Sequence, residues 1–210
     1  MIYLDENLLL NVATTMARSR ANGPGVRAVI WVQGCTIGCP GCYNNFTHPH
    51  ASNKLSSPEK IAEWINSIDG IEGITFSGGE PFEQALAISS VIEVVNSKRE
   101  NPLSVFIFTG FEFEALSHST DHAVQKLLSM TDLLSAGPYI ASLNQENLLW
   151  RGSSNQELIY LTKKYSNADE EKWLKNSPIE ELVMTDNGIM QTGFRSKKGD
   201  LYKILMQTFS

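Results

Sequence analysis

Three cysteines within eight residues constrain this chain more than any other feature of its sequence. They occur as Cys35-x3-Cys39-x2-Cys42, and the 210-residue chain contains no further cysteine. An odd number of crowded cysteines suits a disulfide framework poorly, whereas closely spaced thiols are typical of metal ligands. Gly38 and Gly41 lower the steric cost of wrapping a tight loop around a bulky group. The segment therefore predicts a metal-binding loop.

The residues alone leave two occupants of this loop open. One is zinc, which takes four ligands and would need His48 or His50 beside the three thiols. The other is a 4Fe–4S cluster, in which three cysteines ligate three irons and leave the fourth iron open to a non-protein ligand. If iron occupies the site, both histidines are expected to be surface loop residues.

Strand and helix patterns alternate along most of the chain, which predicts an α/β fold with parallel strands and helical crossovers. Apolar, β-branched runs predict strands, and apolar residues at helical spacing predict helices. The expected strands are residues 26–34, 73–77, 104–110 and 132–137, and the expected helices are residues 56–69, 83–98 and 112–130. Such sheets bind ligands beyond the carboxyl ends of their strands. The cysteine loop, "SGGEP" and "FTGF" all follow expected strands, so we expect them to meet there.

The "SGGEP" segment, residues 77–81, has the composition of a ligand-binding rim. Two glycines at a strand end let the backbone approach a ligand closely. Glu80 is anionic and Pro81 fixes the turn, so this rim would suit a ligand that carries an ammonium group. The alternative is an ordinary strand-to-helix turn in which Glu80 is solvated.

The two motifs together resemble the radical S-adenosylmethionine (SAM) superfamily. In that superfamily Cys-x3-Cys-x2-Cys is followed, one βα unit later, by Gly-Gly-Glu-Pro, as it is here. The resemblance implies a 4Fe–4S cluster whose open iron is chelated by the amino and carboxylate groups of SAM. One electron from the cluster then cleaves SAM to a 5′-deoxyadenosyl radical, which abstracts a hydrogen atom. It also implies a partial (β/α)6 barrel, with about six parallel strands and the site at its mouth.

Four further segments resemble the glycyl-radical-enzyme activating proteins, and most closely those of anaerobic ribonucleotide reductase. These segments are residues 22–35, 39–44, 108–116 and 149–156. The resemblance implies that the radical target is a glycine Cα–H on a partner glycyl radical enzyme, and that flavodoxin or ferredoxin donates the electron. Two other functions stay open: a radical SAM enzyme acting on a small molecule or peptide, and a zinc-stabilised binding module without catalysis.

The same resemblance assigns roles to ten residues of this chain. The cluster ligands would be Cys35, Cys39 and Cys42; Gly41 and Tyr43 would lie beside the adenine; Gly78, Gly79 and Glu80 would hold the amino group; and Thr109 and Gly110 would meet the ribose or methionine portion.

The chain departs from the activating proteins in two places. Ala136-Gly137 stands where they usually carry Asp-Gly. They also tend to end soon after the segment that corresponds to residues 151–156, whereas this chain continues for more than fifty residues. Arg151 in that segment is expected to line a pocket or a partner surface. The role of Arg27 stays open between orienting a carboxylate and structural pairing.

The C-terminal part of the sequence differs from the rest, because a polar stretch after about residue 163 interrupts the alternation of strand and helix patterns. We expect residues 1–164 to form the radical SAM core and residues 165–210 a small extension packed on it as a cap or a docking surface. "IEELVMTDNGIMQTGF", residues 179–194, predicts a hairpin around Asp186-Asn187-Gly188, and a short helix is expected after it.

Charge and hydropathy argue against two classes of partner. The net charge of −6 argues against a nucleic-acid-binding protein, which normally presents a basic stripe. No stretch approaches the ~20 consecutive apolar residues that span a bilayer. The first residues have neither the basic region nor the apolar run of a signal peptide. We therefore expect a cytoplasmic protein with no membrane or nucleic-acid partner.

Overall fold

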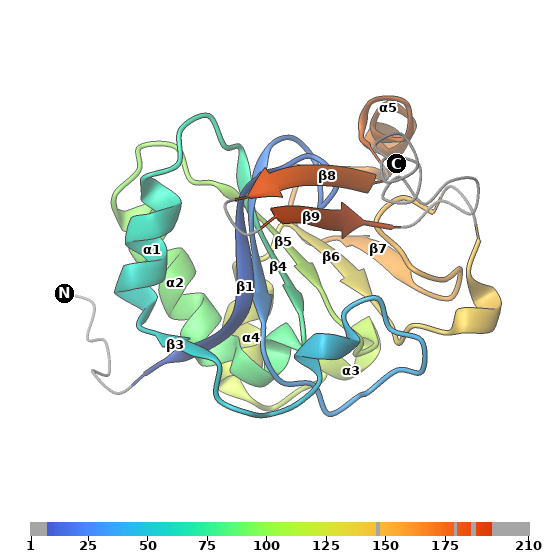
Figure 1. Cartoon of the computed structure of the whole chain (residues 1–210), viewed down its shortest axis with the longest axis horizontal. Coiled ribbons are helices and arrows are strands. Elements are labelled where there is room, and N and C mark those ends of the chain that lie inside the picture. The colour runs from blue at the N-terminus through green and yellow to red at the C-terminus, as the bar shows by residue number, and fades with distance from the viewer. Residues whose placement is uncertain (1–7, 146–147, 179, 186–187, 195–210) are drawn as a thin grey trace.

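A seven-stranded sheet forms the centre of the molecule, with strand order β3-β1-β2-β4-β5-β6-β7 (Figure 1). The computed structural model describes residues 8–145, 148–178, 180–185 and 188–194. The strands of this sheet are β1 (Leu10–Ser19), β2 (Arg27–Val32), β3 (Lys54–Ser56), β4 (Gly73–Gly78), β5 (Ser104–Phe108), β6 (Leu133–Ala136) and β7 (Glu157–Tyr160). All four expected strands are therefore present.

The middle of the sheet is parallel and its flanks are antiparallel. Strands β2, β4, β5 and β6 pair in parallel, whereas β1, β3 and β7 pair antiparallel with their neighbours. The expected α/β fold is confirmed, with a sheet that is mostly parallel. The described sheet has four parallel strands rather than about six, so the partial barrel stays a prediction. The reason lies in the connections, because a parallel pair needs a long crossover, usually helical. β1 returns to β2 through a short turn, and no α-helix occurs in the described part of the β6–β7 loop.

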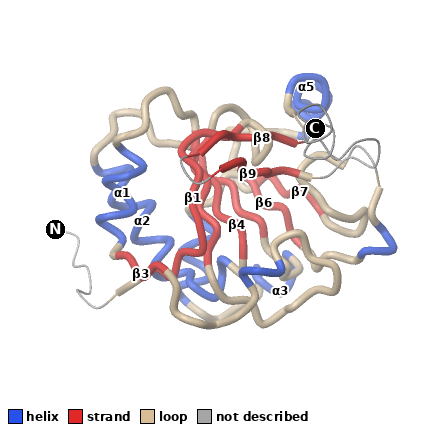
Figure 2. Tube along the Cα trace, in the orientation of Figure 1, coloured by secondary structure: helices blue, strands red, loops and turns tan. Residues whose placement is uncertain are grey.

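Helices cover one face of the sheet, as Figure 2 shows. They are α1 (Pro58–Asn66), α2 (Ala85–Ser97), α3 (Phe113–Ser117) and α4 (His122–Ser129). Apolar side chains of α1, α2 and α4 form one buried cluster with alternate residues of the parallel strands. Ser57 caps α1 as its sequence predicts, because its hydroxyl accepts a hydrogen bond from Lys60 N. The expected helix over residues 112–130 is divided where Asp121 caps α4.

The opposite face of the sheet is covered by the C-terminal part of the chain. Strands β8 (Glu180–Thr185) and β9 (Gly188–Gly193) form the expected hairpin, and α5 (Glu170–Asn176) precedes it (Figure 1). Val183 and Met190 of the hairpin pack on Val29 and Trp31 of β2. The short helix expected near the end of the chain lies outside the described residues. Within the described residues, no helix combines the length and apolar character needed to cross a bilayer.

Arg27 at the start of β2 has a structural role. Its side chain is completely buried, and its guanidinium donates five hydrogen bonds of 2.7–3.0 Å to backbone carbonyls and to the hydroxyls of Thr75 and Ser104. Burial lowers the pKa of Arg27. These bonds join β2 to β4 and β5 at their amino ends, which is the end of the sheet away from the cysteine loop. Among the described contacts no carboxylate is hydrogen bonded to Arg27, so the structure favours the structural role left open above.

Candidate functional site

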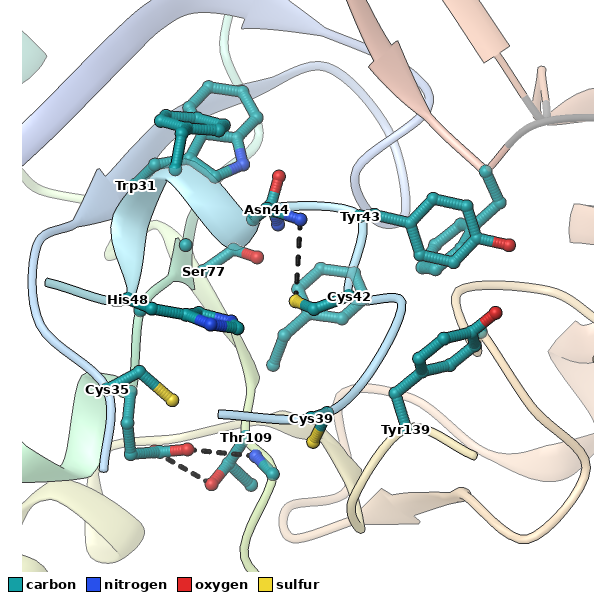
Figure 3. A pocket seen from close by; sticks show the side chains of 18 of the residues that line it. Trp31, Cys35, Cys39, Cys42, Tyr43, Asn44, His48, Ser77, Thr109 and Tyr139 are labelled. Carbon is teal, nitrogen blue, oxygen red and sulfur yellow. Dashed lines mark hydrogen bonds between the residues drawn. The ribbon is translucent and has the colours of Figure 1, made fainter. Parts of the chain in front are cut away.

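A cavity of about 250 Å³ lies at the carboxyl ends of β2, β4 and β5, between the cysteine loop and the C-terminal hairpin (Figure 3). Nine of the ten residues assigned a role from the sequence line it: Cys35, Cys39, Cys42, Tyr43, Gly78, Gly79, Glu80, Thr109 and Gly110. Gly41 is not among the lining residues and instead lies against Tyr139, whose ring would be 3.7 Å from a Cβ at position 41. The structure thus brings together three segments that are distant in sequence.

The three cysteines are unpaired thiols, each partly exposed. All three line the cavity, as Figure 3 shows. Backbone amides approach two of the sulfurs, and Asn44 N donates to Cys42 Sγ at 3.4 Å. Burial raises the pKa of the Cys35 and Cys42 thiols, while nearby backbone N–H groups act in the opposite direction. A bound metal would favour the thiolates, which these amides are placed to stabilise.

The cysteine loop is held at its two ends and along one side. Gly34 N donates to Thr47 O at 2.8 Å, and Cys35 N donates to His48 O at 3.0 Å, which closes the base of the loop. On one side Tyr43 packs against Tyr139 with ring centroids 5.3 Å apart, and its hydroxyl accepts a hydrogen bond from Asn144. The loop after β6 therefore supports the cysteine loop.

The Gly78-Gly79 pair is required by packing inside the protein. Gly78 has φ +97°, and a Cβ there would lie 2.7 Å from backbone atoms of Val32. A Cβ on Gly79 would overlap the carbonyl of Gly34, which accepts a hydrogen bond from Glu80 N. The glycines therefore let the end of β4 approach the beginning of the cysteine loop. The expectation that they serve a ligand stays a prediction.

Glu80 is a buried carboxylate at the floor of the site. It is 1% exposed, so the alternative of a solvated Glu80 is wrong. Its Oε1 accepts from Thr109 Oγ1 at 2.8 Å and Phe82 N at 2.9 Å, and its Oε2 accepts from Gly110 N at 2.9 Å. Burial raises the pKa of Glu80 to about 7, against the lowering effect of these donors. No basic side chain of the described residues pairs with it, so a cationic ligand would relieve the cost of its charge.

The two histidines after the loop have different positions. His48 lines the cavity beside the cysteines. His50 Nε2 lies 2.8 Å from Glu83 Oε2, and Glu83 also accepts hydrogen bonds from Thr36. Burial alone would raise the pKa of Glu83, but the hydrogen bonds from Thr36 and His50 outweigh it and lower that pKa. Across the described ranges, no three His, Cys, Asp or Glu side chains are arranged around a single-metal site.

The "WRGSSNQ" segment divides into two parts. Gly152 and Gln156 line the cavity, and Gln156 Oε1 accepts from Gly152 N at 2.7 Å. Arg151 instead points to the tail, where its Nη2 lies 3.8 Å from Glu170 Oε2. Gly152 and Gln156 therefore fit a role in the pocket. Arg151 connects the segment before β7 to the first residue of α5.

Sequence reasoning missed several lining residues: Thr14, Asn22, Trp31, Asn44, Ser77, Phe108, Tyr139 and residues 190–194. Ser77 and Asn44 lie within the segments 77–81 and 39–44, so their place at the cavity could have been inferred. No local signal places the hairpin residues at the cavity, because long-range packing decides where a hairpin docks.

Comparison with known proteins gives the family. A family model described as "4Fe-4S single cluster domain" matches residues 21–159. The anaerobic ribonucleoside-triphosphate reductase-activating protein of Escherichia coli K12 is 30% identical over 146 residues, which cover 67% of this chain and 92% of that protein. The proteins of the same name from Vibrio cholerae and phage T4 are 34% and 30% identical, over 64% and 65% of this chain and 88% and 85% of theirs.

The chain belongs to this family of activating proteins. The resemblance inferred from the cysteine and glycine motifs is thereby confirmed. Among solved structures, QueE from Escherichia coli aligns with 49% of this chain and 52% of its own at 18% identity and a TM-score of 0.37, which is too low to bear on the fold.

The residues of the cavity fit a 4Fe–4S cluster. Three thiols are the donor set of a cluster that keeps one iron open, and amide N–H groups near the sulfurs are the usual surroundings of such clusters. The buried carboxylate of Glu80 borders the same cavity without a cationic partner among the described residues. The arrangement therefore has room and chemistry for an iron–sulfur cluster together with a ligand that carries an ammonium group.

Proposed function

We propose that this protein reductively cleaves SAM at a 4Fe–4S cluster and uses the resulting radical to install a glycyl radical on an anaerobic ribonucleotide reductase. The observation that carries the proposal is that three free thiols border the same cavity as one buried carboxylate, which has no basic partner among the described residues. The names of the curated relatives supply the target.

Each part of the cavity has a role in this proposal. Cys35, Cys39 and Cys42 ligate the cluster, which when bound supplies the electron that breaks the C5′–S bond of SAM. Glu80 orients the amino group of SAM, and the hydrogen bonds from Thr109 and Gly110 fix the direction of its carboxylate. A carboxylate that is already oriented loses little conformational entropy when the ligand binds.

The remaining assigned residues shape the surroundings. Tyr43, which Asn144 and Tyr139 hold in place, borders the adenine side of the cavity. Gly41 acts by letting the cysteine loop turn at φ +77° beside Tyr139. Gly78 and Gly79 bring the rim close to the loop, so that the amino group can be held near the cluster.

The fold proposed for the catalytic core is a partial barrel with fewer parallel strands than the six expected. In this proposal residues 1–164 are the catalytic core, and residues 165–210 are an extension that packs on the face of the sheet left open by α1, α2 and α4. The support is that each parallel strand from β2 to β5 delivers one segment of the cavity at its carboxyl end. Flavodoxin or ferredoxin is the proposed electron donor.

The proposal is tested with protein that is purified and reconstituted with iron and sulfide under anaerobic conditions. Incubation with reductant, SAM and the anaerobic ribonucleotide reductase should give a glycyl radical signal in electron paramagnetic resonance, together with 5′-deoxyadenosine. A preparation with a full cluster that cleaves SAM but never yields the radical would reject the reductase as the target. Protein that holds zinc and no iron after reconstitution would reject the whole proposal.

A further inference from the structure

The C-terminal hairpin forms part of the catalytic cavity. Five consecutive residues of β9 and its end line it: Met190, Gln191, Thr192, Gly193 and Phe194. Side chains alternate between the two sides of a strand, so a strand seen face-on contributes every second residue. A run of five consecutive lining residues favours an arrangement in which one edge of β9 borders the cavity.

This wall has no counterpart in the matched family region. The family match ends at residue 159, whereas β8 begins at Glu180. The alignment with the Escherichia coli protein covers nearly all of that protein but about two thirds of this chain. The hairpin is therefore an addition to the shared catalytic core.

A carboxylate clamp docks the hairpin on the core. Glu181 of β8 accepts hydrogen bonds from Arg20 N at 2.9 Å, from Ala21 N at 3.0 Å and from the hydroxyl of Ser19. These groups lie at the end of β1 and in the turn that follows it. Hydrogen bonds to a charged group are stronger than those between neutral groups. Among the described residues of the hairpin, Glu181 accepts the most hydrogen bonds from the end of β1 and the turn after it.

Two further contacts align the hairpin with the cavity. Asn22 Nδ2 donates to Thr192 Oγ1 at 2.8 Å, and both residues line the cavity. Phe194 packs edge-on against Tyr43 of the cysteine loop, with ring centroids 5.7 Å apart. A shift of the hairpin would therefore move this wall of the cavity.

We propose that the β8–β9 hairpin is the substrate-side wall of the cavity, against which an extended peptide segment of the protein substrate lies, and that Glu181 is its positioning residue. The proposal rests on the function proposed above. β9 pairs only with β8 among the described strands, so its other edge offers backbone N–H and C=O groups to an incoming peptide. Such an edge recognises main chain, which suits a substrate residue that has no side chain.

The test compares Glu181→Gln with Glu171→Gln in the full-length, cluster-loaded protein. The first substitution would place an amide N–H group against backbone donors, whereas Glu171 is 88% exposed and pairs weakly with Lys175 at 3.9 Å. For Glu181→Gln we expect the glycyl radical formed per 5′-deoxyadenosine to fall on the order of tenfold, which corresponds to about 1.4 kcal/mol. SAM cleavage without the reductase should change less than about twofold, and the control should match wild type in both.

Hydrogen exchange of residues 189–193 provides the second readout. In wild type these amides should be protected further when SAM and the reductase bind, and in Glu181→Gln they should exchange faster. Thr192→Val loses one buried hydrogen bond, so it should lower the radical yield and speed the exchange by smaller amounts than Glu181→Gln. This variant replaces Glu181→Gln in the test if Glu181→Gln fails to fold. Two results would overturn the proposal. One is fast exchange of residues 189–193 in Glu181→Gln with an unchanged radical yield, and the other is wild-type exchange of these residues in Glu181→Gln.

The outcomes also separate this inference from the proposed function. If wild type cleaves SAM but forms no glycyl radical, the assignment of the reductase fails. Hydrogen exchange alone then tests the hairpin. If SAM protects the amides of residues 189–193 in wild type but not in Glu181→Gln, the hairpin still forms a wall of the cavity. Absence of that protection in wild type would reject it.

Discussion

The two halves of the cavity differ in how firmly the protein fixes them. At the strand-end rim, Glu80 is 1% exposed and its carboxylate oxygens accept three hydrogen bonds. In the cysteine loop, the three thiols are partly exposed, and the described hydrogen bonds hold mainly the base and one side of the loop. The rim is therefore preorganised by the polypeptide, whereas the loop has fewer contacts of its own around the thiols and would be held further by the proposed cluster.

This difference predicts which substitutions should affect the cluster and which should affect SAM binding. A change in the loop should remove the cluster and everything that follows from it. A change in the rim should leave the cluster in place and weaken SAM binding. Substitutions in the loop, the rim and the sheet test that separation, in order of decreasing effect on SAM chemistry.

Replacing a loop cysteine should have the largest effect. Cys39→Ser loses one of the three proposed thiolate ligands, so iron content should fall sharply and SAM cleavage should become undetectable. Iron analysis and 5′-deoxyadenosine measurement check this. His48→Ala is the matched comparison, since His48 lines the same cavity and would be the fourth ligand of a zinc site. It should retain iron, and loss of the bound metal in His48→Ala as well as in Cys39→Ser would favour zinc.

Replacing the rim carboxylate should spare the cluster. Glu80→Gln removes the negative charge and turns an amide toward Gly110 N, so the dissociation constant of SAM should rise about 30-fold, or about 2 kcal/mol. Equilibrium binding to the reconstituted protein measures it. Glu83→Gln, on the same turn but paired with Thr36 and His50, should change the constant less than about threefold. Equal effects of the two variants would contradict the role of Glu80.

Alanine substitutions of Gly79 and Gly38 should distinguish a glycine required by close packing from one required only by its positive φ. At Gly79 a Cβ would overlap the Gly34 carbonyl, so Gly79→Ala should lower the free energy of unfolding by about 2–3 kcal/mol. At Gly38 a Cβ would meet nothing within 4 Å, and the cost should be limited to about 1–2 kcal/mol from its φ of +59°. Urea unfolding of the metal-free proteins decides, and a Gly79→Ala variant as stable as wild type would refute the packing argument.

The buried arginine should affect stability and leave the site alone. Lysine cannot replace the planar fork of Arg27, which joins three strands, so Arg27→Lys should lose about 2–3 kcal/mol of unfolding free energy. SAM affinity of the folded variant should stay within about twofold, because Arg27 lies at the other end of the sheet. A large loss of affinity without loss of stability would show that the two ends are coupled.

Motif chemistry allowed the centre of the site to be predicted from sequence. The cysteine spacing, the glycine–glutamate rim and the Thr109-Gly110 pair each follow an apolar strand, and parallel strands place their carboxyl ends together. The physical reason is local, because strand periodicity and turn residues are encoded within short segments.

Features that depend on distant contacts were not predicted. The β1 sequence mixes apolar and polar residues, so its pairing with β2 and β3 was not visible. The hairpin was recognised from its turn residues, but its place at the cavity depends on Glu181 meeting the turn after β1. The ligand contact expected of Gly78 and Gly79 stays a prediction, and the sequence did not show that backbone atoms of Val32 and Gly34 pack against them.

The most direct test of the central claim is electron paramagnetic resonance of the reduced, iron-reconstituted protein with SAM labelled with ¹⁵N at its amino group. We predict that SAM changes the cluster spectrum and that a hyperfine coupling to the labelled nitrogen appears in wild type and weakens in Glu80→Gln. A cluster spectrum that does not respond to SAM in the wild-type protein would contradict the account.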